Sequence, residues 1–150
     1  MTRAAMARAR GDGGSAIIEF CVLAVLMLVP VVYLVVTLGR LQAGAFATQG
    51  AAREAGRAFV TARDEASGRE RADAAAAIAF ADQGFEDLRL IDLDINCAAS
   101  PCLAPDARVT VRATLQVVLP AVPRLVDEFV PARITVDAQH VATVERFGAR

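Results

Sequence analysis

The sequence predicts an α+β fold, in which a long N-terminal helix is followed by a second helix and a three-stranded antiparallel sheet. Three observations predict it. Residues 16–38 are almost entirely apolar. Residues 40–84 are rich in alanine, the residue with the highest helix propensity. Apolar and polar residues then alternate in three segments of the C-terminal half, as in half-buried strands.

The apolar run from Ala16 to Leu38 comprises 23 residues. As an α-helix it would be about 35 Å long, at ~1.5 Å per residue. The hydrocarbon core of a bilayer is about 30 Å thick, so the run can cross it with some tilt. Pro30 lies within the run, where it removes one backbone hydrogen bond and is expected to kink the helix.

A short basic segment precedes this run, with three arginines and a single acid in the first twelve residues. Excess arginine on one side of a membrane helix favours a cytoplasmic location for that side. We therefore expect a leader at residues 1–14, a transmembrane stem at residues 15–39 and an extracytoplasmic α+β domain at residues 40–150. The stem would hold the chain in the lipid bilayer as a single-pass protein.

Glu19 is the only charged residue inside the apolar run. An acid at the centre of a membrane helix costs roughly 2.5–3.5 kcal/mol, so such a residue is a functional candidate. Glu19 lies only about 6 Å along the helix from Ser15, however, so its carboxylate can also reach water at the cytoplasmic interface. If the chain is cut after Gly14, the new amine of Ser15 can instead pair with Glu19 of a neighbouring subunit.

An ordinary secretory signal peptide is the competing interpretation of the N-terminal segment. Residues 45–47 have the small-x-small pattern of its cleavage site. Such peptides have apolar cores of about 7–15 residues and no buried acid, whereas this core is longer and contains Glu19. The sequence therefore disfavours ordinary secretion.

Beyond Leu38 the helix is expected to continue to about Arg63. Small residues recur along it at heptad-like spacing and at spacing four, which would let a second helix approach closely. The ladder at spacing four consists of Ala43, Ala47, Ala51 and Ala55. Two interpretations stay open, namely a self-assembly seam or a composition that simply favours helix.

The remaining elements follow in order. The segment Ser67–Glu70 has the spacing of a capping box and is predicted to start the second helix, which ends near Gly84. Strands are predicted at residues 88–97, 108–119 and 133–139. A slip in the alternation at positions 90–91 predicts a bulge, and the prolines before the third strand predict a loop with one helical turn around residues 125–129.

Cys97 and Cys102 enclose four residues between the first two strands. In an extracytoplasmic domain they are expected to form a disulfide. A thioredoxin-like redox centre would need two intervening residues, and a metal site would need more ligands than the single histidine, His140, supplies. Cys21 lies in the stem and is interpreted as a small apolar filler.

The composition points away from several classes of function. The formal net charge is −1, and no segment clusters arginines without acids, so no nucleic-acid partner is expected. The sequence contains no nucleophile-and-base pattern and no glycine-rich phosphate loop, so we expect no enzyme and no cofactor. His140 has the same alternation phase as Val136 and Ala138, which is typical of a sheet residue.

Residues 14–20 resemble a class III, prepilin-type signal, in which cleavage after glycine leaves glutamate at mature position five. Together with residues 49–58 and 138–147, they make the chain similar to the TadE-like proteins, with an actinobacterial appearance. These are minor pilins or pseudopilins of tight-adherence (Flp-type) type IV pili. Phe20 stands where many processed members of the family have tyrosine.

The resemblance implies a pilin-like fold and cleavage between Gly14 and Ser15 by a prepilin peptidase. It also implies assembly through Glu19 and Phe20 with other pilin subunits and the tight-adherence assembly platform, a role in cell adhesion, and incorporation into extracellular pili. Two alternatives remain open. One is a pseudopilin of a secretion or DNA-uptake machine, and the other is an unprocessed single-pass anchor with an extracellular binding domain.

Overall fold

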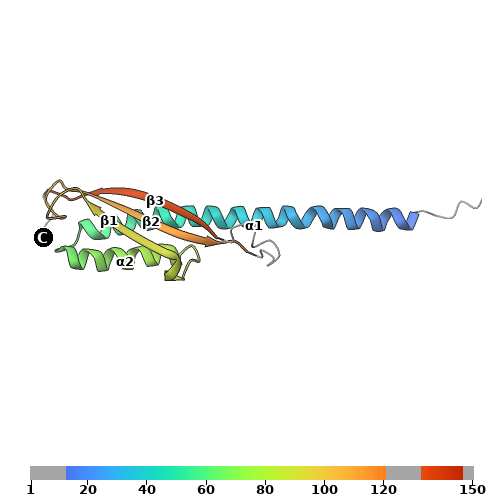
Figure 1. The fold of residues 1–150 in the computed structure, drawn as a ribbon, viewed down its shortest axis with the longest axis horizontal. Helices are drawn as coiled ribbons and strands as arrows, with labels where there is room; N and C mark the ends of the chain where they lie inside the picture. Colours follow the sequence, from blue (N-terminus) through green and yellow to red (C-terminus); the bar gives the residue numbers. More distant parts are fainter. Residues whose placement is uncertain (1–12, 121–132, 147–150) are drawn as a thin grey trace, which may run out of the picture. The chain divides into compact units, whose positions relative to one another are not determined.

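The computed structural model describes residues 13–120 and 133–146. Its elements are α1 (Gly13–Val60), α2 (Glu65–Ala81), a short 3₁₀ helix η1 (Leu88–Leu90), and the strands β1 (Ile91–Cys97), β2 (Arg108–Val118) and β3 (Arg133–Thr143) (Figure 1). The tertiary contacts divide the chain into two units, residues 1–36 and residues 37–150. The α+β fold and the order of its elements are as the sequence predicts. We call residues 37–150 the domain.

The sheet of the domain is an antiparallel meander with the strand order β1-β2-β3. In its register Leu93 lies opposite Ala113, which lies opposite Ala138. Every second residue of the central strand is buried, namely Val109, Val111, Ala113, Leu115 and Val117. Because β2 has a neighbour on each side and helices over one face, this apolar row forms the centre of the core.

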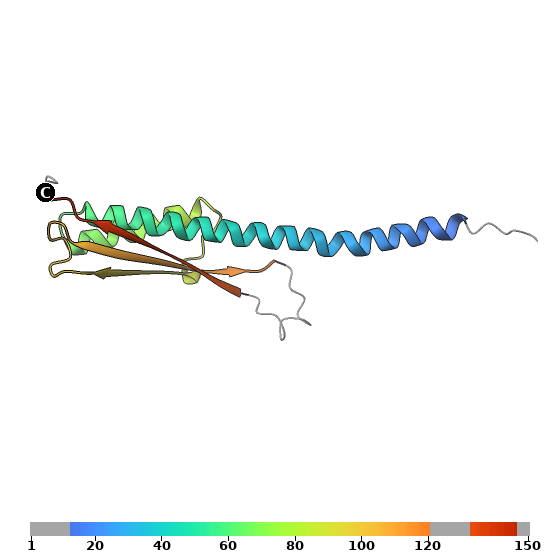
Figure 2. The same ribbon diagram turned by 90° about the horizontal axis from the view of Figure 1, so that it is seen from above.

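The part of α1 within the domain lies along the sheet (Figure 2). Two glycines of α1 bring the helix close to the strands. A Cβ atom placed on Gly44 would lie 2.6 Å from Val117 Cγ2, and one placed on Gly56 would lie 3.4 Å from Ala142 Cβ. Five further small residues of α1 are buried in the core of the domain, namely Ala47, Thr48, Ala51, Ala52 and Ala55. The close approach of α1 to the sheet thus depends on the missing side chains at positions 44 and 56.

The small-residue ladder is therefore used inside the chain. Ala47, Ala51 and Ala55 are each at most 1% exposed, and Ala43 packs at the margin of the same core. Since these residues already lie in the core of the domain, a second copy cannot reach them. The interpretation of the ladder as a self-assembly seam is wrong for this fold.

The second helix begins two residues before the predicted capping box. Asp64 is its N-cap, and the Asp64 carboxylate accepts a hydrogen bond of 2.9 Å from the backbone N–H of Ser67. This hydrogen bond is the main cause that holds the pKa of Asp64 below its ordinary value. Ser67 is the third helical residue, so the predicted start was wrong. Aspartate caps a helix at least as well as serine, so Asp64 can serve as the N-cap in place of Ser67.

The end of α2 agrees with the prediction. The helix stops at Ala81, and Gly84 follows with a φ angle of +76°. The backbone N–H of Phe85 donates to the carbonyl of Phe80 at 3.0 Å, and that of Gly84 donates to Ala81 at 2.9 Å. This pair of bonds is the Schellman motif, which requires a left-handed residue and turns the apolar residue after it toward the helix. Phe80 and Phe85 are both buried in the core.

Two boundaries of the sheet differ from those predicted. The slip at positions 90–91 is not a bulge, because η1 ends at Leu90 and β1 starts at Ile91. The third strand continues four residues beyond Gln139, to Thr143, since β3 pairs along the whole of β2 from Arg108↔Thr143 to Val118↔Arg133. The helical turn predicted around residues 125–129 lies outside the described residues.

Candidate functional site

The stem carries apolar side chains on all sides. Every side chain from Ala16 to Val36 is exposed, and α1 is long and apolar enough to cross a membrane. A helix that is apolar all round needs an apolar environment on every side, which a lipid bilayer or neighbouring apolar helices supply. The structure is therefore compatible with a single-pass membrane anchor.

The predicted cleavage residues Gly14 and Ser15 lie in the first turn of α1, which begins at Gly13. The first four N–H groups of a helix have no intrahelical partner, so its first turn unwinds at little cost. The leader at residues 1–12 lies outside the described residues.

Glu19 follows Ser15 by four residues, about one helical turn, so the two positions lie on one side of the helix. The side chain of Glu19 is exposed, and its neighbours one turn further along, Val22 and Leu23, are apolar and exposed too. Within residues 13–120 and 133–146 no side chain forms an ion pair or hydrogen bond with this carboxylate. Phe20 is also exposed and projects from a different side of the helix.

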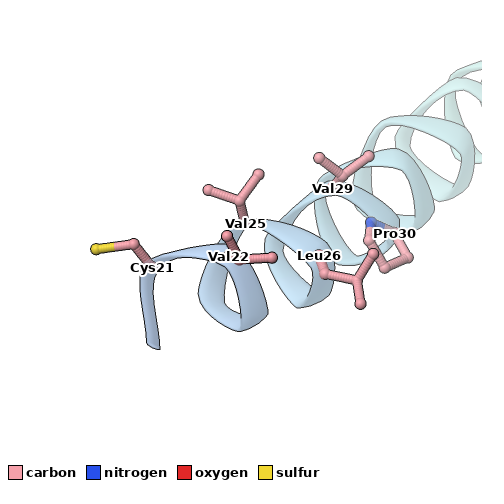
Figure 3. Close-up of a pocket in the computed structure, with 6 residues that line it drawn as sticks. All are labelled: Cys21, Val22, Val25, Leu26, Val29 and Pro30. Atoms are coloured by element: carbon pink, nitrogen blue, oxygen red, sulfur yellow. The ribbon is translucent and has the colours of Figure 1, made fainter. Parts of the chain in front are cut away.

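The helix is continuous through Pro30. Proline has no N–H, so the carbonyl of Leu26, four residues earlier, loses its helical hydrogen bond at this point. Cys21, Val22, Val25, Leu26, Val29 and Pro30 line a shallow, open hollow on the helix surface (Figure 3). All six side chains belong to one helix, so the hollow is a surface feature of the stem.

The predicted disulfide is present between Cys97, the last residue of β1, and Cys102. The two Cα atoms are 5.2 Å apart, and Cys21 is a free, exposed cysteine of the stem. The backbone N–H of Cys102 donates a hydrogen bond of 2.8 Å to Oε1 of Glu65, in the first turn of α2. The closed loop is thus attached to α2 as well as to the sheet. Its attachment to Glu65 was not visible in the sequence.

Replacing both Cys97 and Cys102 by serine is expected to lower the free energy of unfolding of the domain by about 2 kcal/mol, because the loop that they close is short. Membrane insertion should be unchanged, since the stem is intact. Urea titration of the full chain in detergent measures the stability, and Cys21→Ser is the control. Free thiols at positions 97 and 102 in protein isolated from the cell envelope would contradict the prediction.

A cation–π contact at the start of the domain was missed by sequence reasoning. The guanidinium carbon of Arg40 lies 4.7 Å from the centre of the Phe85 ring. Phe85 is held there by the Schellman motif, and Arg40 is the first charged residue after the stem. The only signal in the sequence was the aromatic residue that directly follows Gly84.

His140 lies on β3 and is half-buried, as its alternation phase predicts. Its Cδ2 atom would lie 3.4 Å from a Cβ atom on Gly56, so the imidazole packs beside α1. In the part of the chain that the structure describes, no group of three or more His, Cys, Asp or Glu side chains could hold a metal ion. The histidine is thus a packing residue of the domain.

No protein-family model, curated protein or solved structure matches this chain. The case for its function therefore rests on the stem, the acid at its start and the disulfide-closed domain.

Proposed function

We propose that the chain is a minor pilin or pseudopilin that takes part in the assembly of tight-adherence type IV pili. It is processed after Gly14 and held in the membrane by its stem, with the domain on the extracytoplasmic side. The proposal rests chiefly on one observation. Glu19 is the only charged residue of the stem, residues 15–39, and it lies one turn after the proposed new N-terminus among exposed apolar side chains.

Cleavage of the Gly14–Ser15 peptide bond would give Ser15 a free α-amino group. Placing a charged group inside a bilayer costs free energy. A processed stem would contain two such groups, the amine of Ser15 and the carboxylate of Glu19. When two stems lie side by side, the amine of one can pair with Glu19 of the other. In a medium of low dielectric constant this attraction is strong and depends steeply on distance, so it would set the axial register between stems.

The disulfide supports the proposed orientation, because disulfides persist in oxidising compartments outside the cytoplasm. The partners in this proposal are a prepilin peptidase, other pilin subunits, the tight-adherence assembly platform and the lipid bilayer. Glu19 and Phe20 act in assembly, and the proposal needs no cofactor, metal ion or nucleic acid.

Replacing Gly14 by leucine is expected to block processing, because a bulky side chain would then occupy the position before the cut. The membrane protein should retain 14 additional residues at its N-terminus. Mass spectrometry of the native N-terminus measures this, and Gly13→Leu is the control for the effect of leucine in the first turn.

The same measurement on the unaltered protein tests the proposal itself. A mature N-terminus at Ser15, in cells with an active prepilin peptidase, is the expected result. If residues 1–14 are retained in such cells, the pilin proposal fails and an unprocessed membrane anchor takes its place.

A further inference from the structure

The backbone of the stem contains a carbonyl group without its usual partner. Pro30 has no N–H, so the carbonyl of Leu26 lacks the hydrogen bond that it would accept in a regular helix. Both residues line the open hollow on the stem surface (Figure 3). In the core of a bilayer no water replaces the lost bond, and a polar group of a neighbouring helix can do so. The Leu26 carbonyl thus offers an acceptor to a second helix.

Tyr33 is a donor in the same stem. It carries the only hydroxyl group between Ala16 and Val36. The side chain is 37% exposed, and its hydroxyl forms no hydrogen bond within the part of the chain that the structure describes. Long side chains of a helix point back toward its N-terminus, so in the proposed orientation this hydroxyl is directed away from the outer membrane surface. A tyrosine hydroxyl in an apolar environment usually has a hydrogen-bond partner.

The register of the proposed assembly brings the donor and the acceptor of two stems to the same level. When the amine of Ser15 in a first stem pairs with Glu19 of a second, the first stem is offset by four residues, about 6 Å. Leu26 of the first stem then lies level with position 30 of the second. The carbonyl of Leu26 points toward the C-terminus and the side chain of Tyr33 points back toward the N-terminus. The two groups therefore meet between positions 30 and 33 of the second stem.

The groups that pair also lie on one side of the helix. At 3.6 residues per turn, Glu19 and Tyr33 are nearly four turns apart and differ in direction by about 40°. Ser15 and Leu26 are three turns apart and differ by about 20°. These residues belong to a stripe with the alternating spacing of four and three that packed helices share, namely Ser15, Glu19, Val22, Leu26, Val29 and Tyr33. We call it the stem stripe.

The middle of the stem stripe is apolar. Val22, Leu26 and Val29 all line the hollow, so a second stem can pack there between the two polar contacts. We propose that the stem of a second copy occupies this hollow, and that the Tyr33 hydroxyl of one stem donates a hydrogen bond to the Leu26 carbonyl of the other. The inference rests on the proposed function, because the pairing of Glu19 with the amine supplies the offset.

The contact gives Tyr33 and Pro30 complementary roles in assembly. Pro30 frees the acceptor in one stem, and Tyr33 supplies the donor from the next. Because both polar contacts require the same offset of four residues, the second contact disfavours any other axial register between the stems.

Disulfide cross-linking of the full chain in its membrane tests the offset. Two tagged forms are produced together in a Cys21→Ala background, one with Val22→Cys and the other with Leu26→Cys. An offset of four residues places these two positions level, so oxidation should link the two forms to each other. Homodimers of either form produced alone would indicate stems without an offset and would overturn the proposal, as would the absence of any link between the forms.

Tyr33→Phe tests the hydrogen bond, because it removes the hydroxyl and keeps the ring. It should lower the yield of the mixed dimer by roughly three- to twentyfold, the range for hydrogen bonds between membrane helices. In a Pro30→Ala background the Leu26 carbonyl regains an N–H partner, so Tyr33→Phe should change the yield less than twofold there. Equal effects in both backgrounds, or no effect in either, would overturn the proposal.

Thr37→Val is the matched control, since it removes a hydroxyl one turn after Tyr33. The Thr37 hydroxyl has no hydrogen-bond partner among the described residues. In the offset assembly it lies level with position 33 of the adjacent stem, where no proline frees a carbonyl. The yield of the mixed dimer should therefore be unchanged, and a loss equal to that of Tyr33→Phe would contradict the specific role of Tyr33.

The N-terminus of the cross-linked chains separates this inference from the proposed function. If the chains begin at Ser15 and Tyr33→Phe has no effect, the hydrogen bond is wrong and the pilin proposal stands. If the chains retain residues 1–14 and the effect of Tyr33→Phe depends on Pro30, the hydrogen bond stands and the pilin proposal is wrong.

Discussion

Replacing Glu19 by alanine is expected to leave membrane insertion and cleavage intact but to lower incorporation into pili at least roughly tenfold. Insertion should become slightly easier, because the stem loses its one acid. Between processed subunits, however, the amine of Ser15 would remain without a carboxylate partner. Removing one partner of a buried ion pair costs about 3–5 kcal/mol, which is enough for this loss.

Glu19→Gln separates charge from size and is expected to share the defect, because it retains the shape and hydrogen-bonding capacity but not the charge. The measurement is the ratio of pilus-associated to membrane-held protein for each variant, with the N-terminus checked in both fractions. If both variants are incorporated at the level of the unaltered protein, the proposed role of Glu19 in assembly is wrong. Glu19 would then be an acid that reaches water at the membrane surface.

Gly44→Ala and Gly50→Ala are expected to change the stability of the domain in opposite directions, although both add one methyl group to α1. At position 44 the new Cβ would lie 2.6 Å from Val117 Cγ2, and Val117 is fully buried and β-branched, so it cannot turn aside. Overpacking of this kind costs about 1–3 kcal/mol, more than the gain in helix propensity. A larger residue, as in Gly44→Ile, should cost about 3 kcal/mol or more.

Position 50 is the matched control, because a Cβ there would meet nothing within 4 Å. Gly50→Ala should therefore stabilise the domain by about 0.5–1 kcal/mol through helix propensity alone. Proteolysis of the full chain in detergent across a urea series measures both changes. Combining Gly44→Ala with Val117→Ala should cost less than the sum of the single changes, since each makes room for the other. Equal stabilisation by both glycine replacements would refute the helix–sheet packing described.

The strands were predictable from the alternation of apolar and polar residues, because one face of the sheet is buried. Val109 to Val117 alternate without a break, so only one strand register buries them. The start of α2 was not predictable in this way, since Asp64 and Ser67 are both good caps. In the structure Asp64 is the cap, and Glu65, in the turn that it starts, accepts a hydrogen bond of 2.8 Å from the backbone N–H of Cys102, a tertiary contact that the sequence does not show.

By itself, the sequence determined that the chain has an apolar stem with one acid near its start, an α+β domain after it, and two cysteines close enough to bridge. These features depend on composition and on neighbours along the chain. Only the tertiary structure decided which side of α1 is buried and which elements of the domain pack against it. Small residues at spacing four permit close approach to a helix or to a sheet equally well. The contacts of Gly44 with Val117 and of Gly56 with Ala142 show that β2 and β3 cover this face, which leaves Phe46, Arg53 and Arg57 on the outside.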